Sequence, residues 1–269
     1  MEALEGFVNF TEYPNCKGDQ NMNIPRPEHP QPDCIRKEWL ALNGTWDFKF
    51  DPGVSGYEQN WQTKTTFDRK IIVPFCMESP LSGIGYKDFM PAVWYRRTFT
   101  VQEAWKNKRV LFHIGACDFF TRVFINGNCV GEHTGGYSAF SFDITQTLRR
   151  GKNTVTIEVR DDVRSGLQPT GKQCSSFASQ GCSYTRTTGI WQTVWLEAVP
   201  QSHIRNFKIN GDVDNSCVEI TVFPGGDMAD GVLEATVIAK GKKIAVGTVK
   251  IASTATSLSI PIPTPTLWS

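Results

Sequence analysis

Hydrophobic and polar residues alternate with a period of two along most of the chain after residue 38. In the segment TWDFKF, residues 45–50, Trp46, Phe48 and Phe50 alternate with polar residues. This alternation is typical of a β-strand with one buried face. Similar short segments recur, and each of them predicts a strand: 70–75, 93–101, 109–116, 120–125, 153–160 and 191–199.

Turn signals separate these segments. Asn126-Gly127 stands between TRVFI and NCVGEH, and an Asn-Gly pair supplies the two positive φ angles of a type I′ hairpin turn. No stretch of a dozen residues carries a convincing apolar stripe with a period of 3.6. Many short strands with turns between them predict a galactose-binding-like jelly-roll β-sandwich over residues 39–199.

A second all-β stretch follows Pro200. Residues 217–223 alternate, residues 231–251 predict two strands around a Gly-Lys-Lys turn, and SLSIPI predicts one more strand. A complete immunoglobulin-like sandwich has about seven strands. Residues 200–269 are therefore expected to form an immunoglobulin-like β-sandwich that is truncated at its C-terminal end, and the final Trp268 is expected to pack on a segment that follows Ser269.

The first 38 residues differ from the rest, because they show no apolar period and contain five prolines. Such a composition predicts an extended arm laid over the surface of a domain. The opening residues MEALEGFVNF lack the basic and apolar regions of a signal peptide. No apolar run in the sequence reaches the length of a membrane span. We therefore expect a cytoplasmic protein.

The composition excludes several classes of partner. The formal net charge of +1 gives no electrostatic basis for binding nucleic acid, and no contact with a membrane is expected. None of the eight cysteines forms a Cys-x-x-Cys pair, so a zinc site is not expected. Eight reduced thiols are expected, although Cys174 and Cys182 flank one loop and would be able to cross-link under oxidising conditions.

The sequence contains no clear catalytic constellation. A Gly-x-Ser-x-Gly elbow is absent, and HTGGYS lacks the residues and the helix of a phosphate loop. The histidines have no metal-ligand spacing and are expected to be separate surface or core residues: His29, His113, His133 and His203. Neither a cofactor nor a bound metal is predicted.

Glycoside hydrolysis would require two carboxyl groups facing each other across a cleft. The residues Glu158, Asp161 and Asp162 come nearest to this arrangement. Their spacing puts Glu158 and Asp161 on opposite faces of a strand. We therefore assign no catalytic pair.

Three stretches together resemble the N-terminal half of family 2 glycoside hydrolases, which include β-galactosidases, β-glucuronidases and β-mannosidases: 93–101 with 109–161, then 184–197, and the closing LWS. The similarity extends over about residues 23–269. Many of the matched residues also have structural roles as turn, cap or core residues. In order, the motifs are Ile125-Asn126-Gly127, Gly135-Gly136-Tyr137, Phe140, Asp143-Ile144-Thr145, Leu148, Gly151-Lys152-Asn153, Gly189-Ile190-Trp191 and Trp195-Leu196-Glu197.

The resemblance implies that a (β/α)8 barrel, with the family's two catalytic glutamates, follows these domains. That barrel is missing from the sequence, so no residue here is given a catalytic role. The resemblance also implies that the loop before the Gly-Ile-aromatic motif, residues 171–188, borders the barrel mouth and shapes the sugar subsite. An equally open alternative is that this loop only packs on a neighbouring domain.

Within this loop, Tyr184 and Arg186 are the best candidates for sugar contacts, with Lys172 and Gln173 behind them. An aromatic ring covers the apolar face of a pyranose, and Arg or Gln donates hydrogen bonds to hydroxyl groups. Several galactosidases and glucuronidases have an Asp six residues ahead of the motif's Gly. Here Ser183 occupies that position, so the subsite has one charge fewer.

Three hypotheses follow. The leading one is that the chain forms the non-catalytic sugar-binding and scaffold domains of a family 2 exo-β-glycosidase, whose partners are a β-linked glycoside and the missing barrel. The second is a stand-alone carbohydrate-binding module, and the third is a structural adaptor that binds protein through an open β edge. Because unpaired edges promote association, a homo-oligomer is expected under all three.

Overall fold

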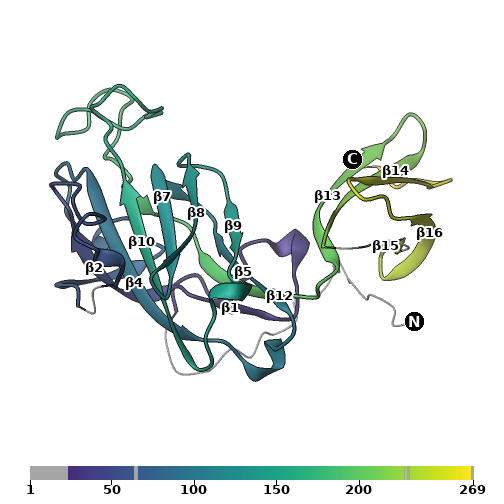
Figure 1. Ribbon diagram of the computed structural model, residues 1–269. Helices are drawn as coiled ribbons and strands as arrows, with labels where there is room; N and C mark the ends of the chain where they lie inside the picture. Colours follow the sequence, from purple (N-terminus) through teal and green to yellow (C-terminus); the bar gives the residue numbers. More distant parts are fainter. Residues whose placement is uncertain (1–23, 64–65, 227, 229–230, 268–269) are drawn as a thin grey trace. The chain divides into compact units, whose positions relative to one another are not determined.

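A computed structural model describes residues 24–63, 66–226, 228 and 231–267 (Figure 1). In this part of the chain the regular structure consists of strands and short 3-10 helices, which confirms the all-β prediction. The chain divides into two compact units, and the second begins its main segment at Val199. No helix among the described residues is long and apolar enough to cross a membrane.

The first unit contains a six-stranded and a four-stranded sheet. In the six-stranded sheet the order is β3-β2-β4-β10-β7-β8, with the bounds β2 (Gly44–Phe50), β3 (Arg69–Val73), β4 (Ala92–Thr100), β7 (Phe120–Ile125), β8 (Asn128–Thr134) and β10 (Lys152–Arg160). In the four-stranded sheet the order is β1-β12-β5-β9, with β1 (Trp39–Ala41), β5 (Arg109–Ile114), β9 (Phe140–Asp143) and β12 (Val194–Val199).

Smaller elements complete this unit. A short ladder joins β6 (Cys117–Asp118) to β11 (Gly189–Ile190). The connections contain five 3-10 helices among the described residues: η1 (Pro32–Cys34), η2 (Trp61–Thr63), η3 (Pro80–Ser82), η4 (Glu103–Trp105) and η5 (Thr145–Thr147).

Residues from both sheets form one hydrophobic core. The alternation that predicted β2 buries Trp46 and Phe48, and β5 contributes Phe112 and Ile114 to the same cluster. Burying each such side chain stabilises the fold by about 1.5–3 kcal/mol. The strands of the sandwich are therefore held together by the period-two pattern that identified them.

A segment of the chain also covers the outer face of the six-stranded sheet, which the alternation did not predict. Asp51 accepts hydrogen bonds from the backbone N–H groups of Ser55 and Gly56 and from Trp94 Nε1. The ring of Trp61 then lies 6.0 Å from that of Trp94, centroid to centroid. As a result Trp94, which points away from the core of the sandwich, is fully buried.

The predicted hairpin turn is confirmed. Asn126 and Gly127 have φ angles of 52° and 86° and join β7 to β8. These are the two positive φ angles that a type I′ turn requires.

Five strands form the described part of the second unit. One sheet has the order β13-β14-β17, and β15 pairs with β16 around a turn at Lys240-Gly241, slightly before the predicted Gly-Lys-Lys turn. The strand β13 was not predicted, because most of its residues are polar or exposed. The bounds are β13 (His203–Asp212), β14 (Cys217–Gly225), β15 (Val232–Ala239), β16 (Lys242–Lys250) and β17 (Thr256–Pro261).

Residues 24–38 lie along the first unit. Asn43 Nδ2 donates to the carbonyl oxygens of Pro25 and Arg26, and the backbone N–H of Ala198 donates to Glu38. Residues 1–23 of the predicted arm lie outside the described residues. We call residues 24–38 the docked arm.

The docked arm is fastened by a buried glutamate. Glu197 of β12 is 1% exposed, and Arg36 Nη1 lies 2.5 Å from its Oε2. Nε2 of His113 is 3.2 Å from Oε2, and Nε2 of His29 is 3.5 Å from Oε1. Burial raises the pKa of Glu197, but the two imidazole rings and Arg36 outweigh it and hold this pKa below its usual range. Two of the histidines predicted to be separate thus share one partner.

Candidate functional site

The chain between β10 and β11 projects from one end of the first unit (Figure 1). Within this connection, the N–H of Tyr184 donates to Lys172 O at 2.7 Å, and the N–H of Cys174 donates to Tyr184 O at 2.8 Å. Gln173 and Tyr184 therefore form a parallel bridge. The loop 171–188 is therefore held together by backbone hydrogen bonds between its own residues. Tyr184 takes part in these bonds, and 59% of its surface is exposed.

Two side chains tie this loop to buried carboxyl groups. Gln173 Nε2 donates to Asp118 Oδ2, and Gln173 Oε1 accepts from the N–H of Thr187, both at 2.8 Å. Thr188 Oγ1 donates to Asp161 at 2.8 Å, and its N–H lies 3.1 Å from both carboxylate oxygens of Glu78. Residues near both ends of the loop are thus held in place.

The three carboxyl groups have perturbed acidity. Burial raises the pKa of Glu78 to about 7. Burial and then the neighbouring Asp161 raise the pKa of Asp118 to about 7. Burial also raises the pKa of Asp161. Because burial disfavours the charged form of a carboxyl group, ionising these three groups near neutral pH destabilises the arrangement in which the loop covers them.

Arg186 has a different environment from the one its sequence position suggested. Its side chain is buried, with the residue 3% exposed, and it donates to the carbonyl oxygens of Cys174 and Ser176 at 3.1 and 2.7 Å. Its guanidinium carbon lies 4.2 Å from the ring centroid of Phe89. These bonds give Arg186 a structural role in shaping the loop, although it also borders a hollow of about 160 Å³ with Phe89 and Arg164.

The other candidate residues lie at or near the surface. Lys172 is exposed, and Ser183 and Gln173 are half-buried. Tyr137, from the Gly-Gly-Tyr motif, is 66% exposed, and its ring packs edge-on against Trp191. Its hydroxyl lies close to Gly171, and the backbone N–H of Tyr184 donates to the adjacent Lys172.

Glu158 and Asp161 have separate partners. The Glu158 carboxylate is fully buried beside Arg122 and Arg160, whereas Asp161 contacts Thr188 and Gln168. No catalytic pair is assigned to these two residues.

The cysteines that the structure describes are free thiols. Cys174 is buried and donates to Ala178 O, whereas Cys182 is exposed. Their cross-link, which oxidation would be needed to form, is therefore not present in this structure.

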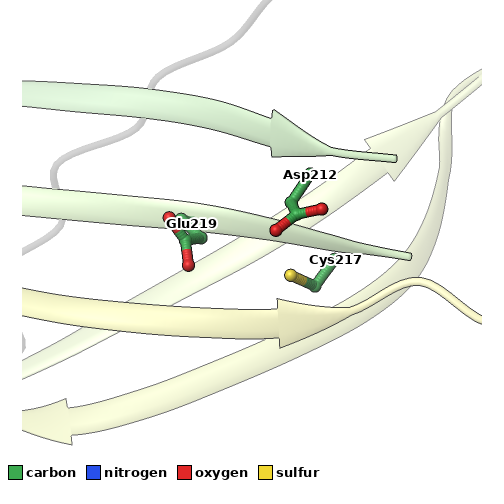
Figure 2. A group of neighbouring side chains, drawn as sticks. All are labelled: Asp212, Cys217 and Glu219. Carbon is green, nitrogen blue, oxygen red and sulfur yellow. The ribbon is translucent and has the colours of Figure 1, made fainter. Parts of the chain in front are cut away.

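One group of metal-binding side-chain types comes together in the described part of the second unit (Figure 2). Ligand atoms of Asp212, Cys217 and Glu219 lie within 4.8 Å of one another. Asp212 and Cys217 pair across the β13–β14 hairpin, and Glu219 lies two residues further along on the same face. The Asp212 carboxylate already accepts two hydrogen bonds from Asn215, so strand pairing and turn formation explain this cluster.

Gly189, which follows the loop, is packed against a buried tyrosine. Its φ angle is +88°, and a Cβ atom at this position would lie 2.1 Å from Tyr95 Oη. We expect Gly189→Ala to lower the free energy of unfolding by about 3 kcal/mol, because it combines backbone strain with overpacking. Urea denaturation would measure this loss.

Gly181→Ala is the matched control, since Gly181 has a φ angle of +55° but no atom within 4 Å of the added Cβ. It should cost about 1 kcal/mol, from strain alone. Adding Tyr95→Phe to Gly189→Ala should recover part of the loss. Equal losses for the two glycine variants would contradict the packing explanation.

Comparison with known proteins defines the class of this chain. Residues 39–200 match the family model described as "Glycosyl hydrolases family 2, sugar binding domain". The chain belongs to glycoside hydrolase family 2. This match confirms the resemblance drawn from the sequence motifs.

Two relatives show what the chain is similar to. It is 30% identical to a β-galactosidase of Thermoanaerobacter pseudethanolicus over 76% of this chain and 26% of that protein. It is 32% identical to a β-glucuronidase of Paenibacillus borealis over 52% of this chain and 24% of that protein. The matched part thus spans about a quarter of the length of these relatives.

The fold also resembles a solved structure. The β-glucuronidase of Ruminococcus gnavus in complex with uronic isofagomine matches with a TM-score of 0.69 and 19% identity, over 87% of this chain and 39% of that one. This likeness supports the β-sandwich architecture.

Proposed function

We propose that this chain forms the non-catalytic sugar-binding and scaffold domains of a family 2 exo-β-glycosidase of the β-galactosidase or β-glucuronidase type. The match of the family's sugar binding domain to residues 39–200 carries this proposal. Relatives named β-galactosidase and β-glucuronidase support it. The catalytic glutamates would then belong to a barrel outside this sequence, and the substrate would be a β-linked glycoside.

The sugar subsite is assigned to the loop 171–188. Tyr184 presents an exposed aromatic ring that would cover the apolar face of a pyranose. Lys172 would donate to hydroxyl or carboxylate oxygens, and the neutral Ser183 lies beside Tyr184. Gln173 and the buried Arg186 would hold the loop in shape through their hydrogen bonds to Asp118 and to backbone carbonyl oxygens.

A binding experiment tests this assignment. Adding glucuronate or galactose to the 269-residue chain should shift NMR signals of the loop and of Tyr137, with affinity weaker than millimolar. Tyr184→Ala should weaken this binding about tenfold, because it removes one ring contact. Phe177→Ala is the matched control, since Phe177 is 63% exposed in the same loop, and it should leave the affinity unchanged.

Three outcomes would revise the proposal. Shifts confined to other surfaces would remove the loop assignment. Affinity better than millimolar would favour a stand-alone carbohydrate-binding module. Hydrolysis of aryl β-glycosides by this chain at enzyme-like rates would show that the chain itself is catalytic.

Two further features belong to the same proposal. Free thiols at the described cysteines suit a reducing compartment such as the cytoplasm. The edge strands β3 and β8 of the six-stranded sheet offer backbone groups for self-association. Sedimentation at high concentration would test for a homo-oligomer.

A further inference from the structure

Asp118 is an enclosed carboxyl group beneath the loop 171–188. The residue is 2% exposed, and its Oδ2 accepts a hydrogen bond from Gln173. Among the described residues, its Oδ1 has no hydrogen-bond partner. A Cβ atom on Gly136 would lie 2.5 Å from this oxygen, so the chain closes tightly over the carboxyl group.

Gln173 links this carboxyl group to the exposed end of the loop. Its side chain is held on one side by Asp118 and on the other by the N–H of Thr187. Its two neighbours along the chain, Lys172 and Cys174, form the backbone hydrogen bonds that hold Tyr184. Holding the Gln173 side chain in place therefore also holds the backbone of residues 172–174, to which the backbone of Tyr184 is hydrogen-bonded.

We propose that Asp118 is a positioning residue for Tyr184 and acts through Gln173. A contact between Tyr184 and sugar rests on the proposed function, whereas the positioning itself is measurable without any ligand. Asp118, which is 2% exposed, acts on Tyr184 through the hydrogen bond that its carboxyl group accepts from Gln173.

The charges around Asp118 make this link sensitive to pH. Asp161 and Glu78 face it with further carboxyl groups, Cys117 adds a buried thiol, and Arg186 counters Asp161. Ionising Asp118 beneath the closed loop is unfavourable, and opening the loop would rehydrate it. The closed arrangement therefore loses stability as the pH rises toward about 7, the pKa of Asp118 beneath the closed loop.

Amide hydrogen exchange at Tyr184 and Cys174 tests the proposal, because these two N–H groups make the bonds in question. At pH 8, Gln173→Glu places a carboxylate against that of Asp118, and exchange at both amides should accelerate about tenfold or more. The reciprocal variant Asp118→Asn/Gln173→Glu restores a donor–acceptor pair with the roles exchanged. Its exchange rates should return to within about threefold of those of the native chain.

The pH profile separates positioning from a general loss of stability. After correction for intrinsic exchange rates, protection of the Tyr184 amide should fall between pH 5 and pH 7 in the native chain, level off above pH 7, and fall much less in Asp118→Asn. The amide of Ile157 in β10 is the internal control, because it reports global unfolding, and its protection should exceed that of Tyr184 at every pH. Native protection in Gln173→Glu, absence of rescue in the double variant, or a level native profile would overturn the proposal.

The two proposals fail in different ways. If the exchange rates respond as expected but glucuronate and galactose shift no loop signals, Asp118 positions Tyr184 and the sugar role is lost. If the sugars shift loop signals but the exchange rates do not respond, the loop assignment stands and the positioning role is lost.

Discussion

Replacing Glu197 by Gln is expected to lower the free energy of unfolding by about 3 kcal/mol at pH 7. The Glu197 carboxylate is buried beside the guanidinium of Arg36 and the imidazole of His113. The neutral amide of Gln cannot balance the positive charge of Arg36. Its NH₂ group would also face the nitrogen atoms of Arg36, His29 and His113, none of which can accept a hydrogen bond while it carries a proton. Urea denaturation would measure the loss, and trypsin should cut the docked arm after Arg36 more rapidly.

A surface glutamate provides the control. Glu132 also pairs with an arginine, Arg122, at 2.5 Å, but its side chain is 49% exposed. Glu132→Gln should therefore cost less than about 1 kcal/mol. If Glu197→Gln cost no more than this, the buried cluster would not be what fastens the docked arm.

The second large effect is an unusual dependence of stability on pH. Glu78 and Asp118 each have a pKa raised to about 7 in the folded chain, and burial is the main cause. Their pKa values in the unfolded chain are about 4. Between these values the folded state binds more protons than the unfolded state, so the free energy of unfolding should fall as the pH rises from about 4 to 7. For Asp118 alone the decrease is about 4 kcal/mol.

Other groups change this profile in known directions. Glu197 and Asp143 have lowered pKa values, so their stabilisation is lost only below about pH 4. Burial lowers the pKa of His133, and this residue opposes the trend with a smaller rise in stability up to about pH 6.5. Asp161, whose pKa is raised, adds to the trend.

Urea denaturation at half-unit steps from pH 4.5 to 7.5 would give this profile. Asp118→Asn should reduce the slope and stabilise the chain at pH 7.5, because it removes a buried charge while keeping an acceptor for Gln173. A native profile that rises steadily over this range would show that these carboxyl groups ionise freely.

Local patterns were sufficient to predict most of the first sandwich. The strands β2 and β10 alternate clearly, and Asn126-Gly127 identifies a hairpin turn without any tertiary information. The strand β13 was missed because most of its residues are polar or exposed. Its sequence therefore shows no clear alternation of apolar and polar positions. Period-two reasoning also assumed one buried face, whereas β4 has a run of buried residues on both faces.

The candidate site was only partly predictable, for a physical reason. The loop 171–188 and Tyr184 could be located from the family motifs. The bond between Asp118 and Gln173 joins residues 55 positions apart, and no local spacing reveals such a pair. Arg186 was named as a candidate sugar contact from its place in the loop, yet several backbone carbonyl oxygens of the folded loop accept hydrogen bonds from its guanidinium group. A lone Asp in the otherwise apolar run GACDFF was the one available signal for Asp118.

The pairing of the docked arm and β1 with β12 also sets the order of events during synthesis. Arg36 and Glu197 are 161 residues apart, and Trp39 of β1 faces Glu197 in the ladder. A ribosome adding 5–20 residues per second needs on the order of ten to thirty seconds to make the intervening chain. During this interval β1 lacks β12, its ladder partner among the described residues, so the four-stranded sheet is completed only after β12 has emerged from the ribosome.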